Sequence, residues 1–299
     1  MKYFAAAEED RRLDPASRRH LRGEFVRLSD GVTHYELSGP DGGPVAVLAG
    51  GLTVPLAYWD GLAEQLHTRG VRTLACSAYG RGYSDRVRSR YDEALFVRQL
   101  AELRSELGID GAVHLVGTSM GALVAMAYAA EHPDTVATLT LAGPAGLIRQ
   151  HLPPHRVLAN DRLAGFVARR FGRRLLESHL GHNVRDPELA ARLTAMVLDA
   201  YRYEGSLFAF FDTLQHVPLS GRADRFRRTG DLGIPALLLW GADDQVTPID
   251  QLDRARSLLR PEQCHVIPDC GHMAPLERPG EVAERISAFT ADRAQKEAS

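Results

Sequence analysis

One serine of the chain lies in a setting that would make its hydroxyl a nucleophile. Ser119 is the centre of the pentapeptide GTSMG, which joins an apolar run typical of a strand (AVHLVG) to an Ala-rich run typical of a helix (GALVAMAYAA). Such a tight turn needs glycine near the serine, and it presents the hydroxyl at a helix N-terminus, where developing negative charge is stabilised. A helix N-cap serine in a glycine-rich turn is the simpler alternative. The strand–turn–helix context favours nucleophilic catalysis.

A serine nucleophile needs a base, and the base needs an orienting acid. His272, in the segment CGHMAP, is the one histidine after Ser119 that is expected in a loop following the last strand. His265 and the earlier His114 alternate with apolar neighbours, as side chains packed in the core of a sheet do. The other histidines after Ser119 are expected at a helix end or in a helical segment: His132, His151, His155, His179, His182 and His216. His272 is therefore the candidate base.

Two adjacent carboxylates compete for the role of the acid. The apolar run PALLLW ends at Gly241, and Asp243 and Asp244 follow in the next turn. A carboxylate in that turn can reach the far ring nitrogen of His272. The other turn that could supply an acid, after VATLTLAG, holds only Pro-Ala-Gly at 144–146. The later turn is therefore expected to supply the acid, and the chemistry of the residues leaves the two aspartates open.

The elements that must position these residues alternate between strands and helices. Helices are expected over 58–69, 94–107, 119–131, 249–259 and 281–293. The first two strands, separated by Asp-Gly at 30–31, are expected to form an antiparallel hairpin. Strand–helix alternation specifies a mostly parallel sheet that is covered on both faces. Eight strands are expected, over 24–29, 33–38, 44–51, 72–77, 112–117, 136–143, 235–241 and 264–268.

The alternation breaks in the second half of the chain. From about 144 to 230 there is no strand signal, but there are Arg-rich helical stretches and the aromatic run LFAFF. We expect a helical cap here, over the carboxyl ends of the strands. It would be inserted into a core formed by residues 24–143 and 231–299. Residues 1–23 are charged and poorly patterned, and we expect them to form a loose N-terminal arm.

The bulk composition excludes several classes of partner. The 299 residues carry 36 Lys plus Arg and 38 Asp plus Glu, a net charge of −2, so nothing pulls the whole chain toward nucleic acid or an anionic membrane. No apolar run is long enough to insert into a membrane, and the N-terminus lacks the apolar segment of a secretion signal. Three cysteines suit reduced thiols. We expect a cytoplasmic protein with a small-molecule substrate, and a homo-oligomer is left open.

Three motifs together resemble those of a known family. GTSMG, WGADDQVTP and GHMAPLERP are similar to the nucleophile elbow, acid loop and histidine loop of the α/β-hydrolase superfamily, over roughly residues 24–292. The similarity is greatest to its lidded group of esterases, C–C hydrolases and cofactor-free haloperoxidases. It implies the α/β-hydrolase fold, with Ser119 as nucleophile and His272 as base. In the family's acid loop, G-x-x-D-x-x-x-P, the acid is third after the glycine, which implies Asp244 and leaves Asp243 as a neighbour.

The resemblance also implies an oxyanion hole made of backbone N–H groups. Its donors would be Gly51 and Met120, with Leu52 as the fallback for the first. Relatives usually carry His-Gly-x after the third strand, and Ala49 stands here in place of the histidine. That histidine is generally structural, so its loss does not exclude catalysis. Two further departures are Ser77, in place of an aspartate in a D-x-x-G-x-G-x-S loop, and Ala122, in place of a glycine common in C–C hydrolases.

The cap is expected to determine which substrate enters. Four residues are expected at the pocket, two of them by family position beside the acid and base: Leu52, Phe211, Val246 and Met273. Phe211 belongs to an aromatic stretch, 201–211, that would either line an apolar pocket or pack the cap onto the core. The arginines at 169, 170, 173 and 174 would either attract an acidic substrate or form a solvated helix face.

These residues predict a serine hydrolase of a small, mostly apolar ester, thioester or lactone. The reaction would pass through an acyl-enzyme on Ser119 and needs no metal or organic cofactor. One rival is a C–C bond hydrolase of a diketone-type substrate with the same triad, and another is a biosynthetic lyase, cyclase or transferase, which Ala49 weakly favours. A ligand-binding receptor would not require all three residues. Epoxide hydrolysis and dehalogenation are disfavoured, because those relatives use aspartate where Ser119 stands.

Overall fold

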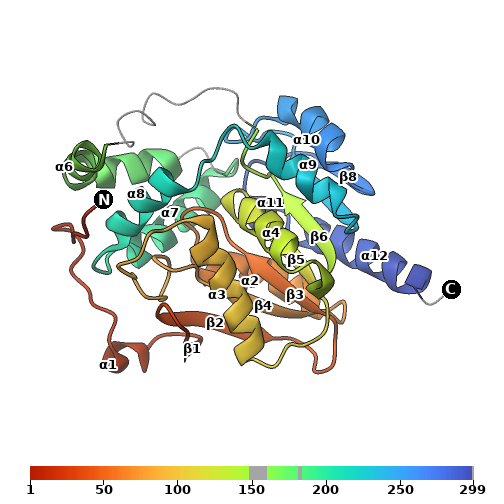
Figure 1. The fold of residues 1–299 in the computed structure, drawn as a ribbon, viewed down its shortest axis with the longest axis horizontal. Coiled ribbons are helices and arrows are strands. Elements are labelled where there is room, and N and C mark those ends of the chain that lie inside the picture. The colour runs from red at the N-terminus through yellow and green to blue at the C-terminus, as the bar shows by residue number, and fades with distance from the viewer. Residues whose placement is uncertain (148–159, 181–183, 298–299) are drawn as a thin grey trace.

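The centre of the molecule is a mixed sheet (Figure 1), seen in a computed structural model that describes residues 1–147, 160–180 and 184–297. The strand order is β1-β2-β4-β3-β5-β6-β7-β8. β2 pairs antiparallel with β1 and β4, and the remaining neighbours pair parallel. The strands are β1 Glu24–Arg27, β2 Val32–Ser38, β3 Val45–Ala49, β4 Arg72–Cys76, β5 Val113–Thr118, β6 Val136–Ala142, β7 Ala236–Gly241 and β8 Gln263–Ile267. The expected mostly parallel eight-stranded sheet is confirmed.

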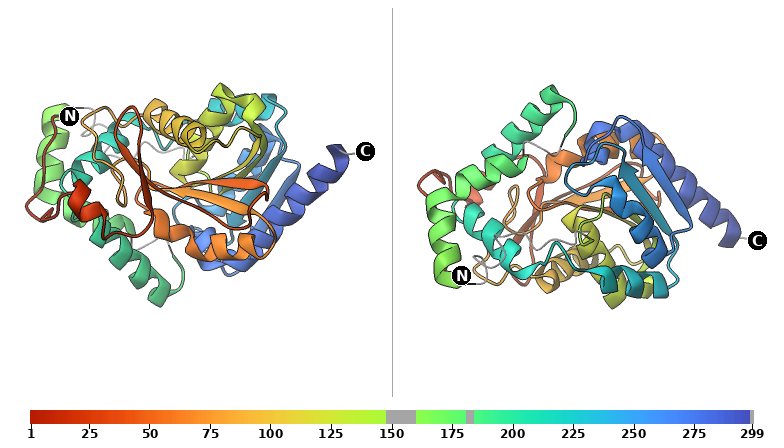
Figure 2. Two further views of the ribbon diagram at one scale, coloured as in Figure 1. Left: turned by 90° about the horizontal axis from the view of Figure 1, so that it is seen from below. Right: turned by 90° about the horizontal axis from the view of Figure 1, so that it is seen from above.

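Helices cover both faces of this sheet, and the strands are accordingly apolar on both sides. α2 (Asp60–His67) and α12 (Pro279–Glu297) pack together on one face, and α3 (Glu93–Glu106) and α4 (Met120–Glu131) pack together on the other (Figure 2). Every residue of β7 is buried, as is most of α4. The smaller helices are η1 Leu56–Trp59, η2 Pro133–Thr135, η3 Ile249–Gln251, α10 Leu252–Leu259 and α11 Ala274–Glu277.

Two histidines differ from their expected places in the core. His114, on β5, and His265, on β8, are half-buried. His114 Nδ1 lies 2.9 Å from Thr138 Oγ1 on the neighbouring strand. β8 is the last strand of the sheet, which leaves His265 and its neighbour Val266 partly open to solvent. Alternation with apolar residues therefore marked both strands correctly, but it did not show that His265 lies on an edge strand.

The long connection from β6 to β7 is helical. Its described helices are α6 (Asp161–Leu180), α7 (Pro187–Ala200), α8 (Ser206–His216) and α9 (Ala223–Asp231). α9, which was expected in the cap, instead packs on α4 and α10 beside the sheet, because Phe226 is fully buried there. Residues 151, 155 and 182, three of the histidines expected in the cap, lie outside the described residues.

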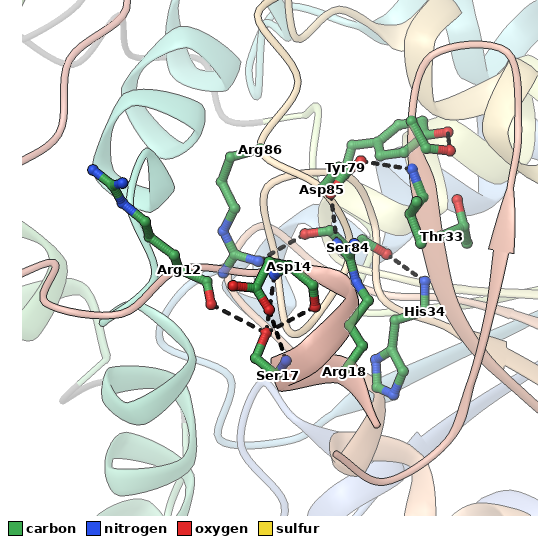
Figure 3. Close-up of polar contacts among 12 residues, drawn as sticks. Arg12, Asp14, Ser17, Arg18, Thr33, His34, Tyr79, Ser84, Asp85 and Arg86 are labelled. Carbon is green, nitrogen blue, oxygen red and sulfur yellow. Dashed lines mark hydrogen bonds and ion pairs between the residues drawn. The ribbon is translucent and has the colours of Figure 1, made fainter. Parts of the chain in front are cut away.

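Residues 1–23, expected as a loose arm, are packed along the cap. Phe4 is buried and meets the ring of Phe208 on α8, while the Met1 amine donates to Asp212 Oδ1 at 3.0 Å. Further along, a short helix α1 (Pro15–Arg18) lies beside the loop after β4, where Arg18 donates to Asp85 (Figure 3). The apolar residues that anchor this segment, Phe4 and its neighbour Tyr3, are few and follow no helical or strand period, which is why the sequence pattern suggested a loose segment.

Within the described ranges, none of the helices combines the length and apolar character that crossing a lipid bilayer requires.

Candidate active site

Ser119 occupies the sharp turn between β5 and α4. Its backbone has φ 53° and ψ −119°, a left-handed conformation that is strained for a residue with a side chain. The flanking glycines are required by close contacts. A Cβ on Gly121 would lie 2.1 Å from the carbonyl oxygen of Ala49, and one on Gly117 would lie 2.6 Å from that of Gly121. The turn can therefore form only with glycine at both positions.

Backbone hydrogen bonds tie this turn to the end of β6. The Ser119 N–H donates to Ala142 O at 3.1 Å, and the Ser119 carbonyl accepts from the N–H groups of Ala122 and Ala145, each at 3.1 Å. The strained conformation is thus held by partners on both sides of the serine. Because these partners belong to β6, to the buried loop that follows it and to α4, the position of Ser119 is determined by the core of the fold.

His272 and Asp244 form a buried pair at the same edge of the sheet. His272 Nδ1 lies 2.8 Å from Asp244 Oδ2, and the two residues are 2% and 3% exposed. Asp244 Oδ1 accepts from the N–H groups of Val246 and Thr247, each at 2.8 Å, and Thr247 Oγ1 donates to Oδ2 at 2.7 Å. Four donors therefore hold a carboxylate in place. A carboxylate there favours the imidazole tautomer with the proton on Nδ1, which leaves Nε2 free to accept a proton.

The neighbouring Asp243 points away from this pair. Its side chain is 46% exposed, and its Oδ2 lies 3.3 Å from Arg185 Nε. Of the two aspartates that the sequence left in competition, Asp244 is the one that His272 contacts. The spacing implied by the family resemblance therefore selects the residue that the fold places against the histidine.

The loops after β6, β7 and β8 meet around His272 through glycines. A Cβ on Gly241 would lie 2.0 Å from the carbonyl oxygen of Gly271, which precedes the histidine. Gly143 has φ +49°, and a Cβ there would lie 3.1 Å from Asp244 Oδ2 and 3.4 Å from His272 Nδ1. Close backbone approach at these two glycines brings the acid loop and the histidine loop together.

A carboxylate that no sequence expectation covers holds the histidine loop from the other side. Glu277, at the end of α11, accepts from the N–H of Gly271 at 3.0 Å and from that of Met273 at 3.1 Å, the residues on either side of His272. It also accepts from the backbone N–H of Arg185 at 3.0 Å. The feature of the sequence that could have indicated this role is the position of Glu277, five residues after His272 and at the end of a short apolar turn.

The two candidate oxyanion donors, Gly51 and Met120, both lie close to Ser119. Gly51 packs against the nucleophile, since a Cβ on it would lie 3.4 Å from Ser119 Cβ and 3.9 Å from Oγ. Met120 is the first residue of α4, so its N–H is at the helix N-terminus. Ala49, which replaces the family's histidine, presents its carbonyl to Gly121. The structure thus brings both backbone positions beside Ser119.

A buried cation holds the loop after β3 that carries Gly51 and Leu52. Arg81 is completely buried, and its Nε donates to Leu52 O at 2.8 Å, next to Gly51. Its other nitrogens donate to Tyr79 O at 3.0 Å and to Thr213 Oγ1 of α8 at 2.9 Å. Burial lowers the pKa of this guanidinium below its ordinary value. Arg81 therefore joins the loop that carries Gly51 to helix α8. Nothing in the sequence around Arg81 indicated this role.

The four residues expected at the pocket fall into two groups. Leu52 and Met273 are buried next to Gly51 and His272 in the chain, and Val246 is half-buried beside Asp244. Phe211 is placed differently: its ring lies 3.1 Å from the position of a Cβ on Gly172 of α6 and meets the ring of Phe210. That contact packs two cap helices together, which was the alternative interpretation of the aromatic stretch.

Comparison with known proteins gives a consistent result. A family model described as alpha/beta hydrolase fold matches residues 43–279. The 2-hydroxy-6-oxo-6-(2'-aminophenyl)hexa-2,4-dienoic acid hydrolase of Metapseudomonas resinovorans is 27% identical, over 90% of this chain and 91% of its own. The 2-hydroxy-6-oxo-6-phenylhexa-2,4-dienoate hydrolase of Burkholderia cepacia is 31% identical, over 75% and 77%. A thermophilic esterase from Thermogutta terrifontis shares the fold, with a TM-score of 0.76, 23% identity and coverage of 91% and 99%.

Proposed function

Because the chain belongs to the α/β-hydrolase fold family, we propose that it is a serine hydrolase with Ser119 as its nucleophile. The strongest support for this proposal is the contact between His272 and Asp244. The 2.8 Å contact between His272 Nδ1 and Asp244 Oδ2 is buried and lies at the sheet edge where the strained turn presents Ser119. A buried histidine–carboxylate pair at the same sheet edge as a half-buried serine at a helix N-terminus is the arrangement that activates a hydroxyl.

In the proposed reaction, Ser119 Oγ attacks the carbonyl carbon and His272 Nε2 takes the hydroxyl proton. Asp244 holds the ring and stabilises the imidazolium. The carbonyl oxygen becomes an oxyanion that accepts hydrogen bonds from the N–H groups of Gly51 and Met120. When the tetrahedral intermediate collapses, the leaving group departs with the proton from His272. Water then attacks the acyl-enzyme, passing a proton to His272, and Ser119 is regenerated when it takes that proton back.

We assign the substrate to small, mostly apolar esters, thioesters or lactones. Leu52, which follows Gly51, and Met273, which follows His272, carry apolar side chains. Val246, close to Asp244 in the chain, is also apolar. Such a lining suits an uncharged acyl group, since burying a charge without a partner would be costly. Hydrolysis of this class of substrate would use only Ser119, His272, Asp244, the two oxyanion N–H groups and water.

The comparisons favour a second candidate. The two hydrolases described above, whose names specify dienoic acids, match this chain along most of its length. Hydrolysis of a C–C bond in a diketone-type substrate would use the same Ser119, His272 and Asp244. It would differ in that the leaving group is a carbanion, which must be protonated at carbon before or as it departs.

Active-site labelling tests the chemistry. A fluorophosphonate should react with Ser119, and peptide mapping should locate the adduct there. Ser119→Ala should lose the label, whereas Ser257→Ala, at an exposed serine on α10, should keep it. An adduct on another residue, or full labelling of Ser119→Ala, would contradict the proposal. Parallel assays with aryl esters of increasing chain length and with a dienoic diketone then separate ester hydrolysis from C–C hydrolysis.

A further inference from the structure

Helix α6 (Asp161–Leu180) has one face that is firmly packed. Its buried residues are small or aliphatic: Ala164, Gly165, Ala168, Gly172, Leu176 and Leu180. This face lies on α8, so closely that a Cβ on Gly172 would come within 3.1 Å of the Phe211 ring and 3.5 Å of Leu207. Because a larger side chain would not fit there, the orientation of α6 is determined, and the opposite face must point outward.

The outward face takes up about half of the circumference of the helix, and it carries large apolar side chains. Six such side chains are exposed in the described part of the chain, and four of them lie on this helix: Leu163 (45%), Phe166 (59%), Phe171 (41%) and Leu175 (42%). The other two, Ile249 and Val266, lie on separate elements. Single exposed apolar residues are ordinary, but a concentration of them on one helix marks an interaction surface.

The same helix is strongly basic. Only two acidic residues lie on it, and both are paired: Asp161 lies 3.5 Å from the Met1 amine, and Glu177 accepts from Arg173 at 2.7 Å. The guanidinium of Arg170 lies over the Phe171 ring at 5.3 Å, so charge and apolar surface are interleaved. The net charge of the whole chain is −2, which makes this positive charge local. Five arginines lie on the helix: Arg162, Arg169, Arg170, Arg173 and Arg174. The guanidinium of Arg169 lies over the Phe4 ring and Arg173 pairs with Glu177, so the exposed Arg162, Arg170 and Arg174 contribute most of the outward positive charge.

The position of α6 leaves this face accessible to a flat partner. In Figures 1 and 2 the helix forms the outer edge of the molecule, at the end opposite to α12 and the C-terminus. The N-terminal segment runs beside the helix (Figure 2), and the side chains of Phe166 and Phe171 remain 59% and 41% accessible. A planar surface could therefore meet the full length of α6.

We propose that the outward face of α6 docks the protein on the surface of an anionic lipid bilayer. Phenylalanine and leucine side chains would enter the boundary between headgroups and acyl chains, while the arginines pair with lipid phosphates. The long apolar stems of arginine allow both contacts from one helix face. A second copy of the chain fits less well, since it would bring two arginine-rich faces together. Nucleic acid would leave the apolar side chains without a partner.

The inference is independent of the proposed function, because it concerns binding and holds whether or not Ser119 is the nucleophile. If the protein is a hydrolase of apolar substrates, docking through α6 would bring the cap side of the molecule toward substrate dissolved in lipid. The tests below therefore measure binding, and their outcome does not depend on turnover.

Cosedimentation with vesicles tests the charge requirement. The protein should bind vesicles of equal parts phosphatidylcholine and phosphatidylglycerol, bind pure phosphatidylcholine much less, and dissociate as salt is added. The double variant Arg170→Glu/Arg174→Glu should lose affinity by at least about fivefold for each arginine removed. The matched control is Arg227→Glu/Arg228→Glu, which makes the same change of charge at two exposed positions of α9 and should bind as the unchanged protein does.

A second pair of variants tests the apolar requirement. Phe166→Ser/Phe171→Ser should weaken vesicle binding, whereas Ile249→Ser/Val266→Ser, at the two exposed apolar residues outside α6, should not. All four positions are exposed, so the variants should keep the far-UV circular dichroism and Tm of the parent protein. Agreement between the charge and apolar variants would assign binding to the face of α6 that carries both.

Three outcomes would overturn the proposal. The first is that the unchanged protein fails to bind the anionic vesicles at low salt. The second is that the α9 control loses as much affinity as the α6 variant, which would mean that binding follows total charge. The third is a dimer in sedimentation equilibrium without lipid that Phe166→Ser/Phe171→Ser abolishes, since a second copy would then cover this face.

Discussion

At the scale of single residues, position in the fold separates groups with the same chemistry. Asp243 and Asp244 are adjacent carboxylates in one turn, yet Asp244 is buried and receives hydrogen bonds from Val246, Thr247 and His272, while Asp243 faces solvent and Arg185. Only the buried carboxylate can set the imidazole tautomer. The two side chains therefore differ in their environment, and substitutions at the two positions should differ in their effect on activity.

We expect Asp244→Asn to reduce hydrolysis far more than Asp243→Asn. An amide at 244 can donate to Nδ1 of His272 and stabilise the wrong tautomer, an effect on the order of 10⁴ in the serine-protease triad. Asp243→Asn removes one exposed ion pair and should leave kcat within about twofold of the parent value. Steady-state kinetics on an aryl ester would measure both. A larger loss in Asp243→Asn would mean that the histidine uses the other carboxylate during turnover.

At the scale of elements, the site depends on how loops at the carboxyl ends of the strands are held. The loop that carries His272 is fixed by Asp244 from one side and by Glu277 from the other. Arg185, just before α7, contributes its backbone N–H to Glu277 and its guanidinium to Asp243 and Asp269. The acid loop, the histidine loop and the cap connection thus share one polar network.

We expect Glu277→Gln to lower kcat by about tenfold and to leave KM nearly unchanged. The carboxylate accepts charge-assisted hydrogen bonds at both sides of His272, and each is worth about 1.5–3 kcal/mol, of which a neutral amide keeps part. Glu277 positions the base without a role in binding, so kcat should carry the effect. Glu281→Gln, at a carboxylate on α12 that lies 3.9 Å from Arg285, is the control. Equal kcat values for the two variants would remove Glu277 from the positioning of His272.

At the scale of the whole molecule, buried polar residues connect segments that are distant in the chain. His34 on β2 is 3% exposed, and its Nε2 lies 2.9 Å from Arg22 O of the N-terminal segment. Its Nδ1 lies 3.0 Å from Ser77 Oγ, which also accepts from the N–H of Leu56. Ser84 adds a bond to the backbone N–H of His34 (Figure 3). Burial in this network lowers the pKa of His34 to about 4.

The buried histidine should make the protein acid-sensitive. The pKa of His34 is about 4 when folded and about 6.5 when unfolded, so the unfolded chain binds more protons between these values. The free energy of unfolding should therefore fall as the pH drops from about 6.5 to about 4, by about 3 kcal/mol from this group. Urea unfolding of the parent protein and of His34→Asn across this range would measure it. The variant should be less stable at neutral pH, but its free energy of unfolding should fall less on acidification. If the two proteins lose the same free energy of unfolding between these pH values, a group other than His34 causes the acid sensitivity.

How much could be predicted from the sequence depended on how local each signal was. The turn at Ser119 and the strands around it depend on neighbouring residues, and the sequence predicted both, with strand bounds shifted by at most two residues. Asp244 needed more than residue chemistry, because Asp243 beside it is chemically identical. The placement of α9 against α4 and α10 and of Phe4 against α8 could not be predicted, since each depends on a buried aromatic ring and its distant partners.

By itself, the sequence determined the order of the strands along the chain, the strained serine turn and the candidate residues of the site. These follow from periodicity and from glycines next to one another in the chain. Only the tertiary structure decided which aspartate meets His272, that Glu277 and Arg81 support the site, and that the basic and apolar side chains of α6 share an outward face. The physical reason is that each of these depends on burial, and burial is decided by which distant segments come to cover a side chain.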